Sequence, residues 1–157
     1  MQEWMLNAFS KGPHIVERIL RVFPHDRLDD RIERDRFTAR EVIGHLSDYE
    51  QTVLERIRVA NMKPGTSVEA YDADARNAEH KFATKDVFHE AEVFETRRGM
   101  TLEYLSTLSP ECWDKTFVKP DGTAISIREY IGFALAHDME HIDQLSLYLA
   151  TEVATIV

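Results

Sequence analysis

The sequence predicts an all-α protein, a four-helix bundle built from one chain of 157 residues. Apolar residues recur with the 3.6-residue period of a helix through most of the chain. Two stretches, "TARE" and "SIRE", have the form of a capping box, in which a Ser or Thr and a Glu three residues later satisfy the first backbone groups of a helix. The chain has no internal repeat and only six glycines and five prolines, so we expect a single globular domain over residues 1–157.

The first two helices are placed by their apolar stripes and their stop signals. The first is clearest over residues 13–22, with an extension ahead of it that carries further apolar residues, and Pro24 ends the run. The second begins at the capping box of Thr38 and keeps helical spacing to about Asn61, where "KPG" follows shortly after. Both helices present one apolar face, as the members of a bundle must.

A long connection and a short turn separate the remaining helices. The polar residues 66–83 predict a mostly irregular connection with at most a short helical turn. The third helix is expected from about Thr84 to Leu108. A "PDG" turn between two β-prone runs then predicts a short hairpin-like turn, and the second capping box, at Ser126, opens a fourth helix that reaches about Ala150.

Charge and composition exclude several classes of protein. A formal net charge of −9 argues against a nucleic-acid partner, because phosphate contacts need a basic surface. The sequence has no run of eighteen apolar residues and no basic leader before an apolar stretch, so we expect no membrane association and a cytoplasmic location. The one cysteine, Cys112 in "SPECWD", has no neighbouring cation to activate it and is interpreted as inert.

Two histidines in "FALAHDMEHIDQL", His137 and His141, are the first candidates for a functional site. Residues four apart share a helix face, with Cβ atoms ~5–6 Å apart, so both imidazoles can reach one metal through bonds of about 2.0–2.1 Å. Their stripe also carries Tyr130 and Leu145 and therefore borders the bundle interior. An unpaired imidazole there costs on the order of 1–3 kcal/mol, which a metal ion would remove.

A third ligand is expected from the second helix, where "EVIGHLSDYE" places His45 among apolar residues. A lone histidine on an apolar face is more often a core residue than a ligand. Opposite a pair of histidines on a facing helix, however, His45 favours a metal site with His137 and His141. The other four histidines stand beside charged or turn residues and are interpreted as surface residues.

The order His137, Glu140, His141 also spells H-x-x-E-H, a zinc-protease pattern in which the Glu is the general base. Glu140 directly precedes His141, so it projects about 100° away from it around the helix. The protease interpretation is therefore rejected. Glu140 remains a candidate for contact with the metal ligands, together with Asp48 and Gln144, and each of these three is as easily a surface residue. Arg97 and Arg98 are interpreted as solvated arginines.

The stretches "FTAREVIGHLSDYE" and "SIREYIGFALAHDMEHIDQL", joined through the "DG" turn, resemble the DinB/YfiT-like family of metal-dependent proteins. The family pattern H-L-x-D-x-E falls on His45, and H-x-x-x-H-x-x-Q falls on the residues from His137 to Gln144. One departure is Phe37, where the family commonly has tryptophan. The resemblance extends over the whole chain and implies one DinB-like domain, a four-helix bundle, a three-histidine divalent metal site and frequently a homodimer.

Three nitrogen ligands leave at least one coordination position open, as in catalytic metal sites. The expected function is therefore a metal-dependent enzyme that acts on a small molecule. We favour an S-transferase in which the metal activates a low-molecular-weight thiol, as in some members of the family. A hydrolase that uses a metal-bound hydroxide and a non-catalytic metal-binding protein are the alternatives. Imidazole ligands suit several metals, of which zinc is favoured and nickel competes.

Overall fold

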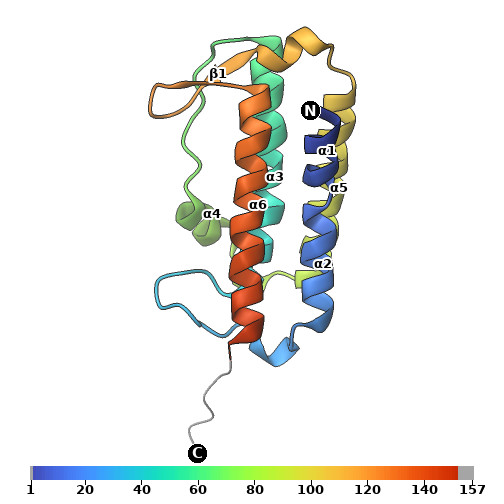
Figure 1. The fold of residues 1–157 in the computed structure, drawn as a ribbon. Helices are drawn as coiled ribbons and strands as arrows, with labels where there is room; N and C mark the ends of the chain where they lie inside the picture. The colour runs from blue at the N-terminus through green and yellow to red at the C-terminus, as the bar shows by residue number, and fades with distance from the viewer. Residues whose placement is uncertain (1, 152–157) are drawn as a thin grey trace, which may run out of the picture.

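The chain folds into a four-helix bundle, seen in a computed structural model that describes residues 2–151 (Figure 1). Two short helices follow each other nearly end to end and form the first arm, and three long helices form the others. The second short helix and the first long helix each pack against the other two long helices. The arms are α1 (Gln2–Ser10) with α2 (Gly12–Val22), α3 (Ala39–Met62), α5 (Val87–Ser106) and α6 (Ile127–Ala150). This architecture confirms the predicted fold class.

Both predicted capping boxes are present and fix where α3 and α6 begin. The Thr38 hydroxyl accepts from the backbone N–H of Glu41 at 3.3 Å, and the Glu41 carboxylate accepts from the backbone N–H of Thr38 at 2.9 Å. Ser126 and Glu129 repeat the arrangement at 3.2 and 2.9 Å. Because the two helices run antiparallel, residues near the start of α3 face residues near the end of α6 (Figure 1).

The core consists of two apolar clusters stacked along the bundle. One contains Leu46 of α3 and Leu145 of α6, and the other contains Tyr49 of α3 and Ala134 of α6. The two clusters therefore meet on α3 between residues 46 and 49 and on α6 between residues 134 and 145. His137 and His141 lie within the interval on α6, and His45 directly precedes the interval on α3.

The connection between α3 and α5 is more ordered than expected. It contains a helix of eight residues, α4 (Ala73–His80), whose first turn is capped by the Asp72 side chain, which accepts from Ala75 N–H at 3.0 Å. Helix α5 begins at Val87 and not near Thr84, because Asp86 caps it and residues 82–84 form a 3₁₀ turn. The short 3₁₀ segments are η1 (His25–Arg27), η2 (Phe82–Thr84) and η3 (Pro110–Asp114).

The expected turn before α6 is an antiparallel hairpin of β1 (Thr116–Val118) and β2 (Ala124–Ser126). The long connection pairs with this hairpin, since Val118 donates its N–H to the Thr66 carbonyl and Val68 donates to the Val118 carbonyl, both at 2.9 Å. The hairpin thus holds the start of the connection beside the bundle. None of the described helices is both long enough and apolar enough to cross a membrane.

Candidate metal centre

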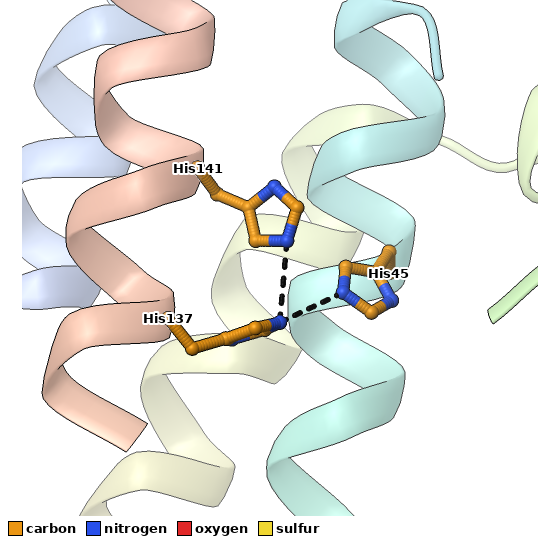
Figure 2. Close-up of side chains that lie close together, drawn as sticks. All are labelled: His45, His137 and His141. Carbon is orange, nitrogen blue, oxygen red and sulfur yellow. Dashed lines mark hydrogen bonds between the residues drawn. The ribbon is translucent and has the colours of Figure 1, made fainter. Parts of the chain in front are cut away.

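The three predicted histidines meet between α3 and α6, as Figure 2 shows. His137 Nε2 lies 3.0 Å from His45 Nε2 and 3.2 Å from His141 Nε2. A tetrahedral ion with Zn–N bonds of the usual length holds its nitrogens about 3.3 Å apart. The observed spacing is close to that value, so the three side chains could hold one metal ion.

The His45 ring is oriented by a chain of polar groups that begins in the long connection. Its Nδ1 lies 3.3 Å from the Tyr71 hydroxyl, which donates to Asp48 Oδ2 at 2.7 Å. Arg76 of α4 donates two further hydrogen bonds to the Asp48 carboxylate, at 2.6 and 2.9 Å. Burial would raise the pKa of Asp48, but the bonds from Arg76 and Tyr71 lower it, so the carboxylate stays charged. Asp48 therefore acts on His45 through Tyr71.

The His141 ring is oriented within α6 itself. Its Nδ1 lies 2.9 Å from Gln144 Oε1, and the Gln144 amide donates to the Tyr148 hydroxyl at 2.8 Å. With the amide nitrogen on the Tyr148 hydroxyl, the amide oxygen is the atom that faces the ring. An amide oxygen can only accept, so His141 must carry its proton on Nδ1.

These contacts set the protonation of two of the three rings. Tyr71 gives its only proton to Asp48 and so accepts from His45 Nδ1–H, while Gln144 accepts from His141 Nδ1–H. His45 and His141 both present Nε2 lone pairs to His137, which can donate a proton to only one of them. A cation at the centre would satisfy all three nitrogens, and the residues present therefore fit a divalent metal.

The electrostatic surroundings keep the rings neutral, as metal ligands must be. The pKa of His45 is lowered to about 4, chiefly by burial and then by the neighbouring His141, whose effect is larger than the opposite effect of Asp48. Burial, followed by His141, His45 and Arg98, lowers the pKa of His137 to about 2. Burial also lowers the pKa of His141. Near neutral pH the cluster offers nitrogen lone pairs without releasing protons.

A pocket of about 480 Å³ opens beside the three nitrogens. Its wall is largely aromatic, and the hairpin and the long connection close two of its sides. Among the described residues that line it, none is acidic. The lining beyond the histidines comprises Phe37, Tyr49, Arg56, Ala70, Tyr71, Ala73, Phe117, Lys119, Pro120, Ile125, Tyr130 and Phe133.

Of the three residues expected to contact the histidines, the structure brings Gln144 and Asp48 to the site but not Glu140. Gln144 touches His141 directly, and Asp48 reaches His45 through Tyr71. Glu140 is not brought to the nitrogens, because its side chain is 69% exposed and its nearest cation is Arg36, 4.0 Å away. Sequence reasoning missed Tyr71, which lies in a polar connection with no helical period to give its direction.

The interpretation of Arg98 as a solvated arginine is wrong, because its side chain is only 2% exposed. It lies between Glu50 of α3 and Asp138 of α6 and donates two hydrogen bonds to each, at 2.8 to 3.0 Å. A fifth bond goes to the Phe9 carbonyl at 2.6 Å. All five N–H donors of the guanidinium are therefore used. The signal in the sequence is its position on the apolar stripe of α5.

Arg97 is half-buried and donates to the Ser47 carbonyl at 2.6 Å.

Comparison with solved structures supports the fold. YfiT from Bacillus subtilis, described as a proposed metal-dependent hydrolase of unusual four-helix-bundle topology, superposes with a TM-score of 0.87 at 19% identity over 93% of this chain and 84% of that one. A mycothiol-dependent maleylpyruvate isomerase superposes with a TM-score of 0.75 at 16% identity, over 92% of this chain and 60% of that one.

Sequence comparison gives the family. A protein of Oceanobacillus iheyensis named as a proposed metal-dependent hydrolase is 23% identical over 146 residues, which are 93% of this chain and 84% of the relative. The family model described as the DinB superfamily matches residues 8–145. That match covers α2 to most of α6, with the three histidines inside it, and the chain belongs to the DinB superfamily.

Proposed function

We propose that His45, His137 and His141 bind one divalent metal ion, zinc or nickel, and that the site is catalytic. The convergence of three neutral Nε2 atoms beside an open pocket supports this proposal. A divalent ion there would supply a Lewis acid that lowers the pKa of a thiol or water bound next to it. The donor set of three imidazoles suits both zinc and nickel.

The pocket favours a thiol S-transferase. The single observation that carries this preference is the absence of a carboxylate from the described pocket lining. Zinc hydrolases with known motifs place a glutamate beside the metal as general base, whereas a thiol at a metal is deprotonated without one. In the proposed reaction the thiol loses its proton to solvent, and its sulfur forms a bond to an electrophilic carbon of the second substrate. The bond from that carbon to its leaving group breaks, and the leaving group departs with the electron pair, as chloride does from 1-chloro-2,4-dinitrobenzene.

The residues around the site have separate tasks in this proposal. Tyr71 and Gln144 hold the His45 and His141 rings with their Nε2 lone pairs toward the centre. Aromatic side chains such as Phe37 and Phe133 exclude water from the reacting atoms. The structural likeness to a mycothiol-dependent isomerase supports a thiol as co-substrate.

Hydrolysis is the second candidate, supported by the names of the YfiT structure and of the Oceanobacillus relative. It requires that water be activated without a carboxylate base in the pocket. Carbonic anhydrase shows that a three-histidine zinc site can do so. The two candidates differ in what they consume, so one assay panel separates them.

The test begins with elemental analysis of untagged protein, followed by reconstitution with Zn²⁺ or Ni²⁺. We expect one metal ion per chain and metal-dependent formation of a thioether from a small thiol and 1-chloro-2,4-dinitrobenzene, measured by mass spectrometry. His137→Ala should abolish both while the helical circular dichroism persists. His14→Ala, at an exposed histidine, is the matched control.

Each other outcome has its own meaning. Turnover of 4-nitrophenyl esters without thioether formation would establish the hydrolase and contradict the transferase. Stoichiometric metal binding without turnover of any thiol or ester would show that the protein binds metal but is not an enzyme for these substrates. No metal after reconstitution would show that the histidines are structural.

We also propose that the protein is a homodimer. The outer face of α6 presents Met139 and Leu147, two turns apart and each about half exposed, as an apolar surface for a second copy. Light scattering should give twice the chain mass for the wild type and the chain mass for Leu147→Lys. A monomeric wild type would contradict the proposal.

A further inference from the structure

One end of the aromatic pocket carries a cation without an acidic partner. Arg56 lies on the same face of α3 as His45, eleven residues further along, which is about 16 Å of helix. Its guanidinium donates to the Glu69 carbonyl at 2.8 Å, and no carboxylate lies within 4.0 Å of it in the described part of the chain. By contrast, Arg76 of α4 donates two hydrogen bonds to the Asp48 carboxylate.

Two buried phenols lie next to this cation. Tyr49 and Tyr130 are 6% and 2% exposed, and their hydroxyl oxygens are 3.3 Å apart. One hydroxyl donates to the other, so the second proton has no acceptor among the described residues. Burial raises the pKa of both phenols and the charge of Arg56 opposes that rise, as expected of a guanidinium beside them. The pocket end thus offers hydrogen-bond donors that lack acceptors.

The charge of the pocket is opposite to that of the whole chain. The chain has 28 acidic and 19 basic residues, but the described pocket lining contains Arg56 and Lys119 and no acid. Lys119 is at the rim, 3.4 Å from Asp121 and partly exposed. A buried hydroxyl donor without an acceptor costs free energy unless a ligand satisfies it. The Arg56 guanidinium is partly exposed and has no carboxylate partner among the described residues, so it is free to pair with an anion.

We propose that the pocket binds a substrate with a carboxylate at one end, held by Arg56 and by the free phenol proton of the Tyr49–Tyr130 pair. The rest of the molecule extends over the aromatic wall, so that its reacting atom lies at the three histidines. The inference rests on the proposed function, because it takes this pocket to be the substrate site. The carboxylate belongs either to the electrophile or to the thiol, and both would be recognised by the same groups.

The test measures binding to metal-free protein, in which a carboxylate cannot bind a metal ion. Cinnamate and its neutral amide, cinnamamide, are titrated by calorimetry as the electrophile pair, and 3-mercaptopropionate and 2-mercaptoethanol as the thiol pair. We expect the anion of at least one pair to bind, and Arg56→Gln to weaken its binding about tenfold, since the lost bond is charge-assisted. Arg56→Lys should retain part of the affinity, and Tyr130→Phe should show a smaller loss.

Arg58→Gln is the matched control, because Arg58 is an exposed arginine of the same helix that lies over Tyr104 and does not line this pocket. An Arg56-dependent preference in the cinnamate pair assigns the carboxylate to the electrophile, and one in the thiol pair assigns it to the thiol. Equal binding of anion and neutral probe, or anion binding unchanged in Arg56→Gln, would overturn the inference. Because no turnover is measured, a failed transferase assay with intact Arg56-dependent binding would refute only the proposed reaction.

Discussion

Two buried polar clusters lie side by side in this bundle and share the same two helices. On α3, His45 faces one cluster and Glu50 the other, and on α6 the adjacent residues His137 and Asp138 divide in the same way. The cluster around Arg98 is charged and closed, since every guanidinium donor has its acceptor. The histidine cluster is neutral and open, with more lone pairs than protons at its centre.

The difference shows how a bundle can separate stability from function. Arg98 joins α5 to α3, α6 and the end of α1, so its hydrogen bonds fix the spacing of the arms. Gly12 contributes by leaving room, because a Cβ there would lie 2.5 Å from Asp138 Oδ2. The histidines can then be held close together, although their lone pairs repel each other, because the neighbouring cluster positions both helices.

The largest effect is expected from Arg98→Met, which removes the cation and leaves Glu50 and Asp138 buried without it. The free energy of unfolding should fall by about 3–5 kcal/mol, measured by urea denaturation of metal-free protein. Replacing all three residues by apolar ones should recover most of the loss. Arg97→Met, at the half-buried neighbour, is the control, and an equal loss in that variant would refute the special role of Arg98.

The two clusters should also respond to pH in opposite directions. In metal-free protein the folded-state pKa of His137 is lowered to about 2 and that of His45 to about 4. As the pH falls below about 6.5, these histidines become protonated in the unfolded chain but stay neutral in the folded protein. The free energy of unfolding therefore falls. Burial raises the pKa values of Glu50 and Asp138 despite Arg98. The folded protein therefore binds protons at these two groups before the unfolded chain does, and their contribution to the free energy of unfolding rises as the pH falls.

Comparing wild type with His137→Gln isolates the histidine contribution. Between pH 6 and 4 the wild type should lose about 1.4 kcal/mol more per pH unit than the variant, because it has one additional group whose protonation favours unfolding. Urea denaturation at a series of pH values measures both slopes. Parallel curves would show that His137 titrates normally in the folded protein.

The sequence was sufficient for the fold and for the three converging histidines. Capping boxes and a 3.6-residue period are local signals, and the spacing of His137 and His141 is fixed by one helix. Tyr71 could not be placed in the same way, because its position depends on the pairing of Val68 with β1 across fifty residues. The charge of Arg98 predicts exposure, and only its place on the apolar stripe of α5 indicates that it is buried.

Tyr71→Phe tests how far the open cluster depends on the long connection. The change removes the oxygen that accepts from His45 Nδ1–H and leaves the ring packing in place. The Kd for Zn²⁺, measured by competition with a chromophoric chelator, should rise about tenfold, as is usual when the partner of a ligating histidine is lost. Tyr104→Phe is the control, since that hydroxyl binds Asn61 far from the histidines. An unchanged Kd would mean that helix packing alone orients His45.

The smallest effect is expected at Glu140, the residue that completes the protease-like pattern with His137 and His141. Its side chain points to solvent, and its nearest cation, Arg36, is itself partly exposed, so the pair contributes little. Glu140→Gln should leave the Kd for Zn²⁺ and the rate of thioether formation within about twofold of wild type, which is about 0.4 kcal/mol. A loss of activity of a hundredfold or more, with metal still bound, would show that Glu140 takes part in the reaction and would contradict its place in solvent.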